Sequence, residues 1–180
     1  AYGEYVFGKG KGRSSVVYDT IGTGVGGGAL QDGRFVEGFS HPEMGHALVV
    51  HHPDDDFKGS CPFHGNCLEG MAAGPAIEKR LGKKGQDVSE DDPYWAIEAS
   101  YIAQCAYNTT LMLSPDVIIF GGGVMKQRHM LENVRQAFQK LINGYVETPA
   151  LDKYIVTPAL EDNAGTLGCL ALAREAVLHA

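Results

Sequence analysis

Val117-Ile-Ile-Phe-Gly-Gly-Gly-Val-Met125 joins a short, wholly apolar run to three consecutive glycines. A brief apolar run that ends in glycine is typical of a strand buried in a sheet with both faces covered. A helix ending near Gly144 is predicted after the glycines, because apolar residues follow at helical spacing: Leu131, Val134, Phe138 and Leu141. A strand, a tight turn and a helix in this order indicate an α/β fold.

Upstream of this unit, the sequence predicts two helices. Asp92-Pro93 is a good helix start, with an N-cap residue followed by proline. That helix is expected to run to Leu113, where Ser114-Pro115 ends it. A helix is also expected from Leu68 to about Gly82.

The two ends of the chain complete the pattern. A helix over residues 1–7 precedes a predicted strand from Ser14 to Thr20. Gln31-Asp-Gly-Arg34 predicts a turn into Phe35-Val36, and therefore a β-hairpin. Three further elements are expected: a strand over Ala47–His51, a strand over Tyr154–Thr157 and a last helix opening at Gly165. Strands that come first and then alternate with helices predict a mixed sheet.

Composition limits the kind of protein. The 180 residues include 15 Lys and Arg against 22 Asp and Glu, which gives a net charge of -7. Such a charge argues against a nucleic-acid partner, which needs a basic surface. The longest apolar stretch, Val117 to Phe120, is far shorter than a membrane span. We expect no membrane association, and a cytoplasmic protein.

The four cysteines fall into two groups. Cys105 and Cys169 lie in apolar helical patterns and are predicted to be small core residues. Cys61 and Cys67 lie in a polar loop with histidines. This usage favours a reduced protein with one metal site over a disulfide scaffold.

The first glycine-rich motif runs from Asp19 to Gly28. A glycine-rich turn between strands exposes backbone N–H groups, which together with the Thr20 and Thr23 hydroxyls suit a phosphate group. It is neither a P-loop nor a Rossmann fingerprint, since no helix follows it. A plain β-hairpin with bulges remains the alternative interpretation.

The second motif is Gly121-Gly-Gly123, directly after the buried strand. Ligands of open α/β sheets bind beyond the carboxyl ends of the strands, and glycines let a flat ring approach the backbone. A tight turn without a ligand is the alternative. Two such loops in one chain favour nucleotide binding.

The third motif is Cys61-Pro-Phe-His64-Gly-Asn-Cys67. Its spacing places three ligands in one loop, and a fourth from outside would complete a closed tetrahedral Zn²⁺ site. The candidates for the fourth ligand are the histidines His46, His41, His51 and His52. Scattered surface histidines and free thiols are the weaker alternative, because the loop has no other evident source of order.

Two carboxylates flank the expected metal: Glu43, in His41-Pro-Glu-Met-Gly-His46, and Glu69, directly after Cys67-Leu68. Carboxylates and an imidazole are usual partners of sugar hydroxyls, because they accept and donate in fixed directions. Either glutamate taken alone would be interpreted as a solvated surface residue.

These motifs, in this order, resemble those of the ROK family of bacterial sugar kinases and repressors, over essentially the whole chain. Asp19–Gly28 resembles the family's phosphate loop, and Glu43-Met-Gly-His46 its Glu-x-Gly-His element. Residues 61–69 resemble its zinc-and-sugar motif, and residues 120–124 its adenosine loop. The resemblance implies an actin/hexokinase-like (ribonuclease H-like) ATPase domain with an inserted zinc loop.

The resemblance also implies ligands for particular residues. Structural Zn²⁺ would be held by His46, Cys61, His64 and Cys67. Sugar hydroxyls would contact Glu43, His46 and Glu69. ATP with Mg²⁺ would lie against Thr20, Gly22, Thr23, Gly24, Pro75, Gly121, Gly122, Gly123 and Val124. His64 replaces a cysteine of the common motif and resembles the fructokinase branch, which implies phosphorylation of fructose to fructose 6-phosphate.

One departure from the family pattern concerns catalysis. The family's N-terminal phosphate loop and its catalytic aspartate have no counterpart here, and Ala1–Tyr5 resembles the helix just after that aspartate. We therefore expect residues 1–180 to be the C-terminal large domain of a two-domain kinase, inactive alone. The apolar stripe of the last helix, about residues 166–179, is expected to pack on the absent domain. The alternatives are that it folds back onto its own domain or pairs with a second copy in a homodimer.

Three rival interpretations remain open at this point. The chain could be part of a sugar-sensing ROK repressor without catalysis, which would have no need of ATP. It could be a zinc-stabilised structural module without affinity for sugar or nucleotide. No residue fixes the sugar, so a hexokinase of broader specificity is the third.

Overall fold

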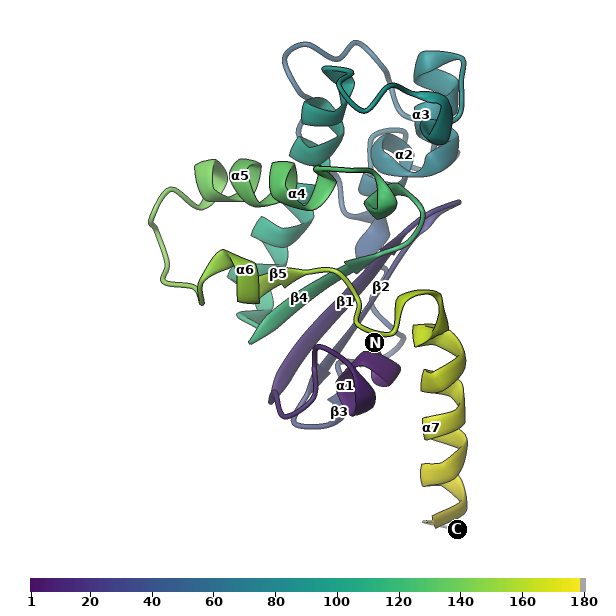
Figure 1. The fold of residues 1–180 in the computed structure, drawn as a ribbon, viewed down its shortest axis with the longest axis vertical. Coiled ribbons are helices and arrows are strands. Elements are labelled where there is room, and N and C mark those ends of the chain that lie inside the picture. The colour runs from purple at the N-terminus through teal and green to yellow at the C-terminus, as the bar shows by residue number, and fades with distance from the viewer. Residues whose placement is uncertain (179–180) are drawn as a thin grey trace.

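The computed structural model describes residues 1–178, and its strands form one five-stranded sheet in the order β3-β2-β1-β4-β5 (Figure 1). β1 pairs antiparallel with β2, and β2 pairs antiparallel with β3. β4 runs parallel to both β1 and β5. The strands are β1 Ser15–Ile21, β2 Val25–Gln31, β3 Arg34–Phe35, β4 Val117–Gly121 and β5 Ile155–Val156. The mixed sheet predicted from the sequence is confirmed.

Helices cover the sheet unequally. α4 (Tyr94–Leu113) and α5 (Met130–Ile142) belong to the larger core, which includes Ile118 and Phe120 of β4. The opposite face carries a small cluster around Ile119, against which Tyr5 of α1 packs. The other helices are α1 Tyr2–Phe7, α2 Leu68–Ala72, α3 Gly74–Leu81, α6 Leu151–Tyr154 and α7 Ala164–Leu178. Short 3-10 turns lie at Met44–His46, Gly85–Asp87, Val124–Lys126 and Glu161–Asn163.

The turn after β4 requires glycine. Every residue of β4 is buried, as its apolar sequence predicts. Gly122 has a φ of 91°, and a Cβ atom there would collide with the backbone of Ile21 at the end of β1. The turn therefore brings the ends of β1 and β4 together. A 3-10 turn precedes α5. At the end of α5 the buried side chain is Ile142, whereas Leu141, which was expected on the apolar face of this helix, is 42% exposed.

The strand expected over Ala47–His51 is wrong. Only an isolated bridge between Leu48 and Cys67 forms there. The side chain of Gln104 in α4 takes the place of a neighbouring strand, because its Oε1 accepts from the Val50 N–H at 2.7 Å and its Nε2 donates to the Val50 carbonyl at 2.9 Å. The backbone is thus satisfied without a sheet.

Other expected boundaries shift. The helix expected from Leu68 to Gly82 is two helices, since the chain leaves helical geometry at Ala73 and the Gly74 N–H donates to the Gly22 carbonyl. Tyr154 ends α6, so the strand expected over Tyr154–Thr157 shortens to β5. Cys105 is buried as predicted, but Cys169 is exposed, because it lies on the outer side of α7.

α7 extends away from the sheet and packs on α1 (Figure 1). The contact is close because glycines face each other there: a Cβ atom at Gly168 would lie 3.1 Å from the Gly3 nitrogen. Apolar side chains of α7 remain exposed, namely Leu170, Leu172, Val177 and Leu178. Residue 179 of the expected helix lies outside the described residues.

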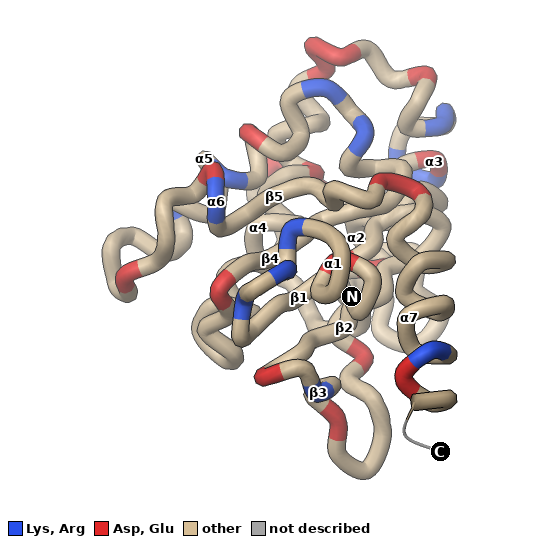
Figure 2. The backbone as a smooth tube through the Cα atoms, turned by 60° about the horizontal axis from the view of Figure 1, so that its bottom comes forward, with Lys and Arg blue, Asp and Glu red and all other residues tan. Residues whose placement is uncertain are grey.

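Charged residues of both signs are interspersed along the chain (Figure 2). Acidic residues outnumber basic ones, which gives the net charge of -7. Charges of both signs spread along the chain are typical of a solvated surface. Within residues 1–178, none of the helices has the length and hydropathy that a membrane span requires.

Candidate functional site

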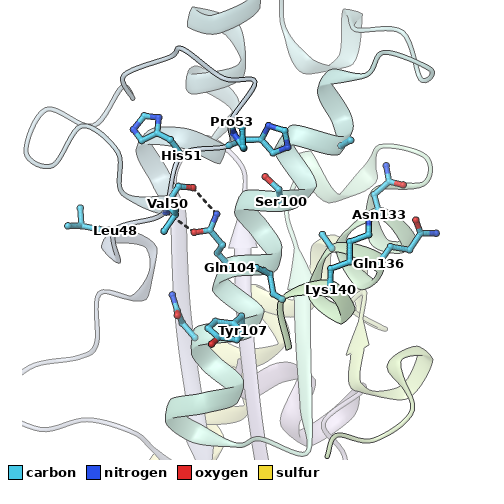
Figure 3. Close-up of a pocket in the computed structure, with 15 residues that line it drawn as sticks. Leu48, Val50, His51, Pro53, Ser100, Gln104, Tyr107, Asn133, Gln136 and Lys140 are labelled. Carbon is cyan, nitrogen blue, oxygen red and sulfur yellow. Dashed lines mark hydrogen bonds between the residues drawn. The ribbon is translucent and has the colours of Figure 1, made fainter. Parts of the chain in front are cut away.

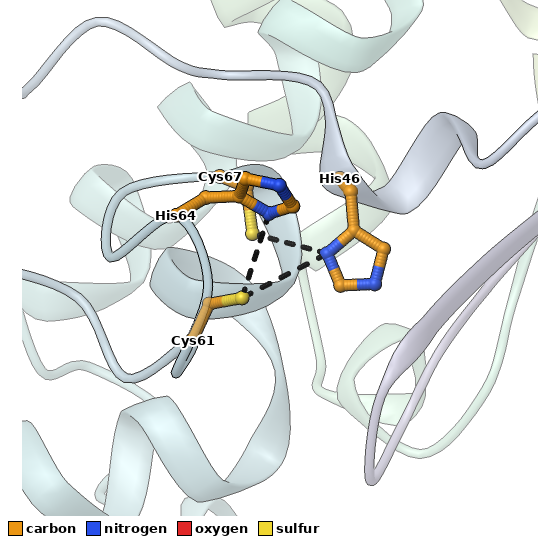
Figure 4. Close-up of side chains that lie close together, drawn as sticks. All are labelled: His46, Cys61, His64 and Cys67. Carbon is orange, nitrogen blue, oxygen red and sulfur yellow. Dashed lines mark hydrogen bonds between the residues drawn. The ribbon is translucent and has the colours of Figure 1, made fainter.

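Four side chains from two distant segments gather at one point. His46 lies in the 3-10 turn after the β-hairpins, and Cys61, His64 and Cys67 lie in the loop before α2 (Figure 4). One ligand atom from each lies within 4.8 Å of the others. The Nδ1 of His46 is 3.8 Å from the Cys61 sulfur and 3.5 Å from the Cys67 sulfur, and the Nδ1 of His64 is 3.7 Å from the Cys61 sulfur.

These distances suit a tetrahedral zinc ion. Zn–S and Zn–N bonds of about 2.3 and 2.0 Å place neighbouring ligand atoms roughly 3.3–3.8 Å apart. Two nitrogens and two sulfurs are also the donor set that Zn²⁺ prefers. The four residues therefore fit a closed, structural zinc site.

Local backbone geometry builds the cluster. Cys61 accepts a backbone hydrogen bond from Gly65 at 3.0 Å, which closes the tight turn that carries His64. The backbone N–H of His64 lowers the pKa of the Cys61 thiol to about 7, so that this sulfur is readily a thiolate. Cys67 is fully buried at the N-cap of α2, where its sulfur accepts from the Gly70 N–H and burial raises the pKa of its thiol.

The structure separates the candidate fourth ligands. His46 joins the cluster, whereas His41 pairs with Glu43 at 2.8 Å on the exposed surface. The His52 ring accepts from the Asp54 N–H, and His51 lines a different hollow. Glu43, expected at the sugar site, therefore points toward His41 in this structure.

Glu69 connects the metal cluster with the first glycine motif. It lies in the first turn of α2, and its Oε2 accepts from the Val25 N–H at 3.0 Å. Its Oε1 lies 3.9 Å from the Nε2 of His46. The carboxylate is thus held between a zinc-ligand candidate and the start of β2.

A groove of about 530 Å³ lies where the ends of β1 and β4 meet. Both glycine motifs contribute to it, as expected for a shared nucleotide site. Five of the predicted ATP-binding residues line it: Gly22, Thr23, Pro75, Gly123 and Val124. The sequence reasoning missed Glu78, Lys84 and Gln127, which line the same groove but belong to no recognisable motif.

Four other predicted ATP-binding residues do not line this groove. Gly121 and Gly122 line a neighbouring hollow on the other side of the turn. Thr20 is exposed on the opposite face of β1 from the buried Ile21. Gly24 faces Glu69 instead of the groove.

A buried polar cluster anchors the segment that leads to Cys61. Arg80 of α3 forms two hydrogen bonds to the carboxylate of Asp55, at 3.2 and 3.0 Å. Its guanidinium also donates to the Tyr94 hydroxyl at 2.7 Å and lies 4.5 Å from the centre of the Phe57 ring. Tyr101 donates to Asp55 at 2.6 Å, and hydrogen bonds from Tyr101 and Arg80 hold the pKa of Asp55 below its usual value against the effect of burial. No sequence motif predicted this cluster.

Glu98 extends this cluster and should make stability depend on pH. It is fully buried and accepts from the Tyr94 hydroxyl, and burial raises its pKa from 4.5 to about 8. The folded-state pKa is the higher one, so its contribution to stability is complete below about pH 4.5 and is lost as pH rises toward 8. The melting temperature should therefore fall as pH rises toward 8, and Glu98→Gln should make this fall smaller. Calorimetry between pH 5 and 8.5 checks it, and equal slopes in the two proteins would contradict it.

A second hollow, of about 650 Å³, contains no predicted site residue except the rejected ligand candidates His51 and His52. It lies between α4, α5 and residues 48–53 (Figure 3). The paired Gln104 and Val50 form part of its wall, and Leu48, Val50 and Leu141 are exposed around it.

Comparison with known proteins gives the family and the fold of the chain. The ROK family model matches residues 1–176. The chain is 47% identical to a fructokinase from Pediococcus pentosaceus over 180 residues, which is 100% of this chain and 62% of that protein. It is 48% identical to a fructokinase from Streptococcus mutans over 182 residues, covering 97% of this chain and 60% of the relative.

A solved structure extends the comparison. A ROK family glucokinase from Streptomyces griseus, in complex with glucose and AMPPNP, superposes with a TM-score of 0.75 at 26% identity. The match covers 97% of this chain and 65% of that one. The chain thus spans about three fifths of the length of the curated relatives it matches.

Proposed function

Since this chain belongs to the ROK family and has its actin/hexokinase-like fold, we propose that it is the nucleotide- and hexose-binding part of an ATP-dependent fructokinase. One observation carries the proposal: a single turn touches both expected ligand sites. Gly22 and Thr23 line the nucleotide groove, and the Val25 N–H holds Glu69 beside the metal cluster. Phosphoryl transfer needs the sugar hydroxyl and the γ-phosphate next to each other, which this turn would provide.

Each site has proposed residues. His46, Cys61, His64 and Cys67 hold structural zinc, which orders the loop that presents Glu69. Glu43, His46 and Glu69 bind hexose hydroxyls, with Glu43 turning away from His41 when the sugar is bound. Mg²⁺ enters with ATP and neutralises phosphate charge. The cysteine ligands must stay reduced, which supports a cytoplasmic location.

The catalytic base is proposed to lie outside these 180 residues. Phosphorylation of an alcohol needs a group that accepts the hydroxyl proton. Asp19 is fully buried in β1, so it has no access to a bound sugar. The longer relatives leave room for a further domain that supplies the base, and in that case residues 1–180 alone bind ligands without turnover.

Gly123→Leu tests the nucleotide groove. Gly123 has helical backbone angles and no atom within 4 Å of a Cβ position, so a leucine there would enter the groove without disturbing the fold. Titration calorimetry with ATP and Mg²⁺ should show affinity lowered by about tenfold or more. Gly165→Leu, in an equally open position on α7, is the matched control. Equal ATP affinity in the two variants would contradict the proposed site.

The exposed side of α7 has a proposed partner as well. Burying two leucines contributes roughly 3–6 kcal/mol, and Leu170 and Leu172 are 62% and 40% exposed. We propose that the remaining domain of the longer protein covers them, or that a second copy does so in a homodimer. Light scattering on the whole protein distinguishes a monomer from a dimer.

A further inference from the structure

We propose that Gly24 is a positioning residue for the sugar site: its missing side chain leaves the space in which the Glu69 carboxylate reaches the Val25 N–H. Glycine in this turn would otherwise be assigned only to phosphate binding. The inference rests on the proposed function for the role of Glu69, but the contact itself is independent of any ligand.

The geometry around Glu69 is specific. Its Oε2 lies 3.0 Å from the Val25 nitrogen, and a Cβ atom placed on Gly24 would lie 2.7 Å from that same oxygen. A carbon and an oxygen at that separation overlap, so one of them must move. The carboxylate ends a flexible side chain and is the movable partner, and its displacement would weaken the hydrogen bond to Val25.

Backbone conformation does not explain the glycine. Gly24 is absent from the glycines with positive φ among the described residues, so an alanine could adopt its backbone. Apart from Glu69, and leaving aside the adjoining Thr23 and Val25, a Cβ atom at Gly24 would have no neighbour within 4 Å among the described residues. The need for glycine at this position therefore comes from Glu69.

The second carboxylate oxygen of Glu69 lies on the side of the metal cluster. The Nδ1 of His46 faces the two cysteine sulfurs, and its Nε2 lies 3.9 Å from Oε1 of Glu69, which is too far for a hydrogen bond. The hydrogen bond from the Val25 N–H is therefore the contact that orients Glu69. Its side chain still has 31% exposure, which leaves lone pairs available to a hexose hydroxyl.

A consequence for binding follows. Thr23 lines the nucleotide groove and Gly24 borders Glu69, so two adjacent residues serve the two proposed ligands. A methyl group at Gly24 should weaken hexose binding through Glu69 while leaving the groove itself open. Losing a hydrogen bond to a charged group corresponds to about a tenfold loss of affinity or more.

The first experiment measures the contact itself. Amide hydrogen exchange of Val25 should be slow in the unmodified chain and faster in Gly24→Ala and in Glu69→Ala. Gly26→Ala is the matched control in the same hairpin, since its Cβ would meet nothing nearer than Thr20 at 4.0 Å, and there the Val25 amide should stay protected. Unchanged Val25 exchange in Gly24→Ala would overturn the inference.

The second experiment measures the consequence in the proposed two-domain protein. Gly24→Ala should raise KM for fructose by about tenfold or more and KM for ATP much less. In a Glu69→Ala background the same change should have no further effect on fructose, because the conflicting oxygen is gone. If Gly24→Ala alone does not fold, the double variant with Glu69→Ala should fold. A double variant that does not fold would contradict the inference, and so would equal increases in KM for fructose and for ATP in Gly24→Ala.

The two experiments separate two kinds of failure. Exchange at Val25 does not depend on hexose, so it tests the position of Glu69 alone. If exchange responds as expected and fructose does not bind to the unmodified protein, the proposed function is wrong and the contact stands. If fructose binds and exchange does not respond, the assignment of Gly24 is wrong.

Discussion

Cys67→Ala protein should bind less than one zinc per chain and lose the fixed structure of residues 53–67. Cys67 is fully buried, supplies one of the four ligand atoms and caps α2 through its sulfur. Binding free energies of structural zinc are on the order of 10 kcal/mol, and a large part of that would be lost from folding. A loss of about 5 kcal/mol corresponds to roughly 10–20 °C in melting temperature for a domain of this size.

Cys169→Ala is the matched control for this prediction. It removes a thiol from the same chain, but Cys169 is exposed on α7 and distant from the cluster. Metal analysis and calorimetry on both variants check the result. One zinc per chain in Cys67→Ala protein, or an equal melting temperature in both variants, would show that the cluster is not a structural metal site.

The second large effect is expected from Arg80→Met. The side chains of Arg80 and Asp55 are 8% and 4% exposed, so removing the guanidinium leaves a buried carboxylate without its partner. Breaking a buried pair in this way costs about 3–5 kcal/mol. Since Asp55 lies in the segment leading to Cys61, we also expect faster loss of metal to a chelator.

Lys126→Met gives the control for Arg80→Met. Lys126 pairs with Asp162 at 2.8 Å, but the two side chains are 62% and 80% exposed. Exposed pairs contribute about 0–1 kcal/mol, so its removal should hardly change the free energy of unfolding. Denaturant unfolding of both variants decides the matter, and similar losses in the two would contradict a special role for Arg80.

Sequence reasoning succeeded where the determining residues are near each other in the chain. Cys61, His64 and Cys67 are local, so their spacing alone predicted the loop that the structure places around one point. Proline and polar residues at its own ends predicted α4 to within one residue: the helix begins at Tyr94 and ends at Leu113, with Pro93 in the N-cap position expected for Asp92. The Asp92 side chain still accepts from the Tyr94 N–H at 3.0 Å. The buried β4 followed from four apolar residues in a row.

It failed where a distant side chain decides the local structure. The apolar run around Val50 resembles a strand, but Gln104 satisfies its backbone from 54 residues away. Pairing of Arg80 with Asp55 and of Glu69 with Val25 leaves no local pattern either. The exposure of Cys169 depends on how α7 packs on α1, which helical spacing alone does not determine.

The most direct test of the central claim is ATP-dependent formation of fructose 6-phosphate by the two-domain protein that we propose to contain these residues. With ATP, Mg²⁺ and fructose, we predict turnover, and Glu69→Ala should lower kcat/KM for fructose by about a hundredfold. Cys169→Ala, with its exposed thiol far from the site, should retain full activity. Binding of ATP and fructose without any product, or an unchanged kcat/KM in Glu69→Ala, would contradict the account.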